Sequence, residues 1–216
     1  MADNIPIHAS TTALLFFDTL NGALHPDDSG APATIAASGY IERLVKIERA
    51  SRAAGISIFY TVPEQRQDGK EWGLTVIGDP PRVTYFRGVN YKGSKFATII
   101  PEIAPQPDDY MIAKHRWSAF FQTCLELSLR TAGLDTIMLA GGSTHVGIAS
   151  TAYSARDHDF NVIILSDAVR SRPPDGDQIT NDLLRKVFPR MARVLTVDEA
   201  VSKFIPCTET HQLRGH

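Results

Sequence analysis

The sequence predicts a three-layer α/β/α domain built on a six-stranded, mainly parallel sheet. Short apolar runs alternate along the chain with longer segments whose apolar residues recur at a helical period. Such alternation is typical of parallel sheets, whose right-handed crossovers place helices on both faces. The 216 residues suit one domain (1–216), and a chain of this length buries a full core without disulfides or a structural metal.

The apolar runs predict the strands, and the segments between them predict the helices. The expected strands are residues 12–17, 56–61, 110–114, 136–140, 161–165 and 193–197. The expected helices are residues 33–54, 120–132, 144–157, 177–189 and, as a short last element, 198–204. Gly55 and Gly133 follow the first two helices, as glycine often does at a helix end.

Residues 63–107 form a long insertion that interrupts this alternation. The insertion is rich in glycine and proline and has room for one short helix near residues 95–103. Loops of this length inside a compact domain are usually functional or mobile. Two interpretations stand: a solvated excursion, or a lid over the site that offers cations to an anionic substrate. Its basic side chains include Arg66, Arg82, Arg87, Lys92 and Lys95.

Composition excludes several classes of protein. The net charge of −2 gives no basic field for nucleic acid, and the longest apolar runs are far too short to span a bilayer. Two cysteines are too few for a disulfide framework. The first residues do not resemble a secretory signal, so we expect a cytoplasmic protein that contacts neither nucleic acid nor membrane.

Residues that follow the strands are the candidates for chemistry, because ligands of such sheets bind outside the carboxyl ends of the strands. Asp18 follows the first strand, Lys114 ends the third, and a glycine-rich turn at residues 141–147 follows the fourth. Taken singly, each signal is weak, since a strand-end aspartate is often only a helix cap. The turn also lacks the lysine of a phosphate-binding P-loop.

Together and in this order, three segments resemble the isochorismatase-like hydrolase superfamily, over residues 12 to about 201. They are ALLFFD at 13–18, KHRWSAFF at 114–121 and LAGGSTHVG at 139–147. The resemblance implies the Rossmann-like isochorismatase fold, a catalytic aspartate at Asp18 and a catalytic lysine at Lys114. It also implies a cis peptide bond between Gly142 and Ser143.

The sequence departs from most of the superfamily at Gly147, where the amidase members have the nucleophilic cysteine. Glycine cannot form an acyl-enzyme, so the resemblance does not imply cysteine hydrolase activity. The true isochorismatases, which cleave a vinyl ether, also have glycine there. Their chemistry implies that Asp18 acts as general acid while Lys114 holds a substrate carboxylate or orders water. Their substrate-binding glutamines are missing after Asp18 and after Thr61, which leaves the substrate open.

Further residues near the three segments are candidates for substrate binding. These are Ser143, Thr144, His145, Arg116, Trp117 and Phe120. For Arg116 a structural ion pair is an equal alternative, and Trp117 and Phe120 either line the pocket or pack in the core. We expect Cys124 to be a small buried side chain about two turns into its helix. The metal-binding residues of the nicotinamidases have no counterpart, so we expect neither a metal nor another cofactor.

Three functions remain open. The first is a cysteine-independent hydrolase of a small, carboxylate-bearing molecule, with Asp18 as general acid. The second is a hydrolase of another small carbonyl or amide compound, in which water activated by Asp18 attacks directly. The third is a non-catalytic relative that binds a small anion, although the intact Asp18 and Lys114 argue against it. The resemblance also implies a homodimer or a homotetramer.

Overall fold

The computed structural model describes residues 4–25, 31–68, 70, 91–171 and 176–207. Its main sheet has six parallel strands in the order β4-β3-β2-β5-β6-β7, which confirms the predicted architecture. The strands are β2 (Thr12–Phe17), β3 (Ser57–Pro63), β4 (Tyr110–Lys114), β5 (Thr136–Gly142), β6 (Asn161–Arg170) and β7 (Arg193–Leu195). Because all six run the same way, their carboxyl ends share one edge of the sheet.

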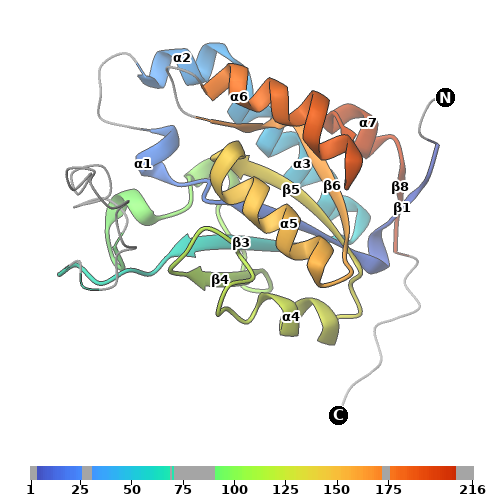
Figure 1. The fold of residues 1–216 in the computed structure, drawn as a ribbon, viewed down its shortest axis with the longest axis horizontal. Helices are drawn as coiled ribbons and strands as arrows, with labels where there is room; N and C mark the ends of the chain where they lie inside the picture. Colours follow the sequence, from blue (N-terminus) through green and yellow to red (C-terminus); the bar gives the residue numbers. More distant parts are fainter. Residues whose placement is uncertain (1–3, 26–30, 69, 71–90, 172–175, 208–216) are drawn as a thin grey trace.

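Helices cover both faces of this sheet. In Figure 1, α5 (Ala149–Asp157) lies in front of the sheet and α3 (Tyr40–Ala54) lies behind it. The helix α4 (Leu125–Thr131) shares a core cluster with α5, and α7 (Val197–Val201) shares the other cluster with α3. The remaining helices are α1 (Asn21–Leu24), α2 (Ala31–Ala37) and α6 (Gly176–Asp182).

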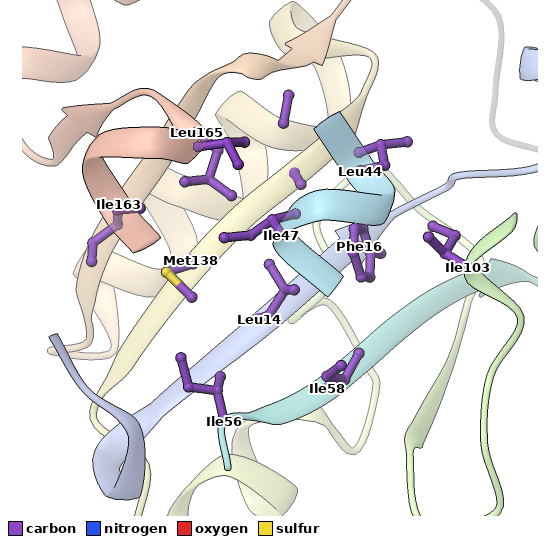
Figure 2. Packing of buried hydrophobic residues seen from close by; sticks show 14 of the residues in the cluster. Leu14, Phe16, Leu44, Ile47, Ile56, Ile58, Ile103, Met138, Ile163 and Leu165 are labelled. Carbon is purple, nitrogen blue, oxygen red and sulfur yellow. The ribbon is translucent and has the colours of Figure 1, made fainter. Parts of the chain in front are cut away.

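The central strand β2 is buried along its whole length, so its alternate side chains supply both faces of the core. Figure 2 shows Leu14 and Phe16 of β2 under Leu44 and Ile47 of α3. The side chains that alternate with them, Ala13, Leu15 and Phe17, belong to the cluster beneath α4 and α5. The strand therefore ends with Phe17 fixed in the core and Asp18 emerging at the sheet edge.

Three of the predicted helices are divided or contain turns of another helical type. The expected helix 33–54 is two helices, α2 and α3, because Gly39 adopts a left-handed conformation with φ of 66°. Residues 144–148 form a π-helical turn before α5. The expected helix 177–189 continues from α6 through a π-helical turn, Leu183–Val187, into a 3₁₀ turn, Phe188–Arg190.

Both ends of the chain also contain a short element that the sequence did not reveal. The strands β1 (Ile7–His8) and β8 (Phe204–Ile205) pair in parallel as a separate two-stranded sheet. Two residues are too few to show an alternating pattern. The predicted strand 193–197 is also shorter than expected. It ends at Leu195 because Thr196 caps α7 in a capping box with Glu199.

The described parts of the 63–107 insertion lie along the segment that follows Asp18. Ile99 bridges Leu20, the amide of Ile100 donates to the carbonyl of Thr19, and the amide of Asn21 donates to the carbonyl of Thr98. The expected short helix is two 3₁₀ turns, Lys95–Ala97 and Pro101–Ile103. The returning limb of the insertion therefore borders the candidate site.

The basic side chains of the insertion that the structure describes have nearby partners. Arg66 pairs with Asp68, Lys92 lies 3.1 Å from Glu64, and Lys95 lies over the ring of Phe96. Arg82 and Arg87 lie outside the described residues.

A search of the described part of the chain found no helix of the length and apolarity that a bilayer crossing requires.

Candidate active site

Asp18 stands at the point where β2 ends, with a backbone conformation that few residues adopt. Its φ is 47°, a left-handed value that aspartate and asparagine tolerate better than most side chains. The amide of Asp18 donates to Oγ1 of Thr61 at 3.0 Å, and the Thr61 hydroxyl donates to Oδ1 of Asp18 at 2.8 Å. Thr61 is fully buried on β3, so it fixes both the backbone and the carboxylate of Asp18.

Lys114 ends β4 and meets the second oxygen of the same carboxylate. Its Nζ lies 2.8 Å from Oδ2 of Asp18, and the side chains of Lys114 and Asp18 are 8% and 22% exposed. The order β4-β3-β2 places the two residues at the same sheet edge with Thr61 on the strand between them. The ammonium also lies over the ring of Phe17, 4.6 Å from its centroid, which is a cation–π geometry.

The glycine-rich turn after β5 comes very close to β2. Gly141 has φ of 113°, and a Cβ there would lie 2.1 Å from the carbonyl oxygen of Phe17. Only glycine fits at this position, because the obstacle is backbone. The next peptide bond, Gly142–Ser143, is cis, as the resemblance implies.

Ser143, Thr144 and His145 are organised by a residue that the sequence did not reveal, Ser171. Oγ of Ser171 accepts the Thr144 amide at 3.1 Å and lies 2.9 Å from Nδ1 of His145. Oγ of Ser143 is 3.2 Å from the same nitrogen. Since both hydroxyls can donate to Nδ1, this arrangement favours the tautomer with its proton on Nε2. His145 is exposed and can thus offer a donor to a ligand oxygen.

Thr144 combines complete burial with an unpaired hydroxyl. Its side chain is 0% exposed, and Oγ1 has no hydrogen-bond partner among the described residues. The same holds for Thr19, directly after Asp18, whose Oγ1 is also buried without a partner in the described part of the chain. Both hydroxyls lie within one residue of a segment that the sequence marked for chemistry.

Gly147 is buried in the π-helical turn and touches the ring of Phe17. A Cβ at this position would lie 2.0 Å from Cε1 of Phe17 and 2.4 Å from its Cζ. Real Cβ atoms do not approach other atoms so closely. A side chain therefore has no room at position 147 while Phe17 keeps its place.

Arg116, Trp117 and Phe120 lie on the segment between β4 and α4. The guanidinium of Arg116 donates to the carbonyl of His115 at 2.7 Å, and Trp117 is 70% exposed. The ring of Phe120 stacks on His158 and contacts Phe160, which lie beyond the far end of α5 from Gly147. Of the two alternatives for Phe120, the structure supports core packing.

The prediction for Cys124 is wrong. Cys124 is exposed and is the N-cap of α4, which begins only at Leu125. The expected helix start at residue 120 fails because Gln122 has φ of 54°, a value outside the helical region. Hydroxyls also bind the backbone of this turn, with Thr123 donating to the carbonyl of Ala119.

The described residues offer no ready metal centre. No group of three or more His, Cys, Asp or Glu side chains is placed to hold a metal ion in the part of the chain that the structure describes. The chemistry available at the sheet edge is that of one carboxylate, one ammonium and several hydroxyls. Such a set can bind an anionic group and transfer a proton.

Comparisons with known proteins agree on one family. A model of the isochorismatase domain matches residues 12–199. YecD of Escherichia coli O157:H7, an uncharacterized isochorismatase family protein, is 32% identical over 198 residues, covering 92% of this chain and 98% of YecD. The phenazine biosynthesis protein PhzD1 of Pseudomonas aeruginosa is 27% identical over 165 residues, covering 76% of this chain and 74% of PhzD1.

Two further similarities are to a curated amidohydrolase and to a solved structure. The ureidoacrylate amidohydrolase RutB of Variovorax paradoxus is 26% identical over 223 residues, covering 94% of this chain and 85% of RutB. The crystal structure of a cysteine hydrolase from Pseudomonas syringae pv. phaseolicola superposes with a TM-score of 0.77 at 23% identity, covering 94% of this chain and 98% of that one.

Proposed function

The chain belongs to the isochorismatase family and is a hydrolase, and we propose that it cleaves a small, carboxylate-bearing molecule without a cysteine nucleophile. The observation that carries the proposal is the contact of Lys114 with Asp18 beside a glycine at position 147. The proton-transfer groups of the site are complete, whereas position 147 offers no thiol. Such a site suits a reaction that proceeds by proton transfer and attack of water.

Vinyl-ether cleavage is the reaction that best uses these groups. Asp18 donates its proton to the terminal methylene carbon of an enolpyruvyl ether, which leaves an oxocarbenium ion. Water adds to the carbon that bears the ether oxygen and gives up a proton that restores Asp18, and the hemiketal collapses to pyruvate and an alcohol. The bond that breaks is the C–O bond of the hemiketal, and no covalent enzyme intermediate is required.

Lys114 would hold the carboxylate of the substrate. In the unliganded site its ammonium pairs with Asp18. A substrate carboxylate would take this ammonium as its partner in place of Asp18. The similarity to RutB, whose substrate ureidoacrylate is itself a carboxylate, supports this class of ligand.

A second candidate is hydrolysis of an amide or related carbonyl compound by water that Asp18 activates as a base. One observation favours it: each oxygen of Asp18 faces a hydrogen-bond donor. The Lys114 ammonium meets one oxygen and the Thr61 hydroxyl meets the other, as for a carboxylate. The similarity to an amidohydrolase agrees with it. The two candidates differ in the direction in which the proton moves at Asp18.

A panel of small molecules separates the candidates. One half contains enolpyruvyl ethers of small carboxylic acids, with pyruvate release followed by a coupled dehydrogenase. The other half contains ureido and amide carboxylates, with ammonia release as the signal. Turnover confined to the ethers is expected. Turnover confined to the amides would establish the second candidate, and binding without turnover of either would indicate an anion-binding protein.

Thiol alkylation is expected to leave turnover largely intact, within about twofold. Alkylation inactivates an enzyme when it blocks a thiolate that the reaction needs, and position 147 has no thiol. Cys124 and Cys207 are both exposed, so iodoacetamide will reach them. Mass spectrometry of the treated enzyme shows that both have reacted, and residual activity is then measured. Substrate-protected inactivation that maps to Cys124 would contradict the proposal.

A further inference from the structure

A side chain at position 147 would clash with the ring of Phe17. The three atoms nearest to a Cβ at Gly147 are Cε1, Cζ and Cδ1 of this ring, at 2.0, 2.4 and 2.8 Å. The backbone of Gly147 has no positive φ that would itself demand glycine. The nearest obstacle to a side chain at this site is therefore the ring of Phe17.

The ring has little freedom to move away. Phe17 is 2% exposed and packs in the core cluster beneath α4 and α5. Its face carries the ammonium of Lys114 at 4.6 Å, and its backbone is paired with Thr61 on one side and Gly141 on the other. Rotation of the ring would disturb the core and the contact with Lys114.

We propose that Phe17 determines the class of reaction at this site, because its ring occupies the space that a nucleophilic side chain at position 147 would need. A cysteine lost by substitution alone would leave a cavity, since protein interiors close only partly around deleted atoms. Here the ring of Phe17 fills the position instead. Phe17 and Gly147 form a complementary pair that commits the site to chemistry without an acyl-enzyme.

This inference rests on the proposed cysteine-independent function, but its tests use neither substrate nor turnover. A failure of the proposed function at Asp18 would leave the measurements below unchanged. A failure of these measurements would leave the role of Asp18 untouched. The two claims can therefore fall separately.

The first test measures whether Gly147→Ala lowers or raises the melting temperature, Tm. In the wild-type background, overpacking against Phe17 is expected to lower Tm by about 5 °C or more. In a Phe17→Val background the obstacle is gone, and alanine, which favours helical backbone over glycine, is expected to leave Tm unchanged or to raise it. The comparison is made within each background, so the cavity left by Phe17→Val cancels.

Phe59→Val supplies the matched control. Phe59 is fully buried in the same cluster, but its ring stacks on Tyr110. In this background Gly147→Ala is expected to lower Tm as much as it does in the wild type. An equal effect of Gly147→Ala in all three backgrounds would overturn the inference.

The second test is the reactivity of an introduced thiol, with Cys124→Ser and Cys207→Ser in every variant. The thiol of Gly147→Cys with Phe17→Val is expected to react with iodoacetamide at pH 7 at least about tenfold faster than that of Gly147→Cys alone, because nearby Lys114 favours an accessible thiolate. If the single variant does not fold and the double variant does, overpacking by Phe17 is again the cause. Folded variants with equal rates would contradict the inference.

Discussion

Asp18→Asn is expected to lower kcat by at least about 10²–10⁴-fold while leaving KM close to its wild-type value. Asparagine is nearly isosteric and keeps a hydrogen-bonding oxygen for Thr61, but it cannot deliver a proton. General acid–base catalysis typically contributes a factor of this size. Because the contribution is made in the transition state, the loss belongs in kcat.

The structure makes asparagine the appropriate replacement. Asp18 has φ of 47°, which asparagine tolerates and alanine does not, so the backbone of the site is preserved. The matched control is Asp198→Asn, since Asp198 also pairs with a lysine, Lys46, but on the exposed surface of the protein. The control is expected to retain wild-type kinetics. An Asp18→Asn enzyme with near-normal kcat would remove Asp18 from both candidate reactions.

Lys114→Met is expected to raise KM for a carboxylate substrate by about 10–100-fold and to slow turnover as well. Hydrogen bonds to charged groups contribute about 1.5–3 kcal/mol, which sets this range. Methionine fills most of the buried space of the lysine stem, so the loss reports on the ammonium and not on a cavity. Steady-state kinetics of Asp18→Asn and Lys114→Met show whether each substitution changes KM, kcat or both.

An uncharged analogue sharpens this prediction. If Lys114 binds the substrate carboxylate, the methyl ester of the substrate binds wild type and Lys114→Met with similar KM. Lys46→Met, which removes the exposed ammonium paired with Asp198, serves as the matched control. It is expected to leave KM unchanged for both the acid and the ester. Equal KM increases for the acid and the ester would show that Lys114 does not recognise the carboxylate.

The sequence predicts the part of the site that depends on strand order alone. The ends of parallel strands must share an edge, so Asp18, Lys114 and the turn after β5 could be placed near one another before the structure. Taken singly, the aspartate and the lysine are weak signals, because an aspartate at a strand end is often only a helix cap. Their chemistry was visible because the three segments together follow the order of the isochorismatase family.

Thr61, Ser171 and Phe17 escaped sequence reasoning because their roles depend on register and packing. Thr61 reaches Asp18 only because β2 and β3 pair with Phe17 opposite Thr61. Ser171 follows a strand five residues longer than its apolar pattern indicates, as β6 runs to Arg170. Phe17 belongs to an ordinary buried run, and nothing in the sequence shows that its ring lies against Gly147.

The dependence of kcat on pH, from about pH 5 to about pH 9, tests the central claim most directly. The proposal assigns Asp18 as general acid, which must carry its proton in the enzyme–substrate complex, so kcat is expected to fall as pH rises. That limb is expected to disappear from the residual activity of Asp18→Asn. If kcat falls instead as pH is lowered, and Asp18→Asn abolishes that limb, then Asp18 acts as a base and the proposed vinyl-ether cleavage is contradicted.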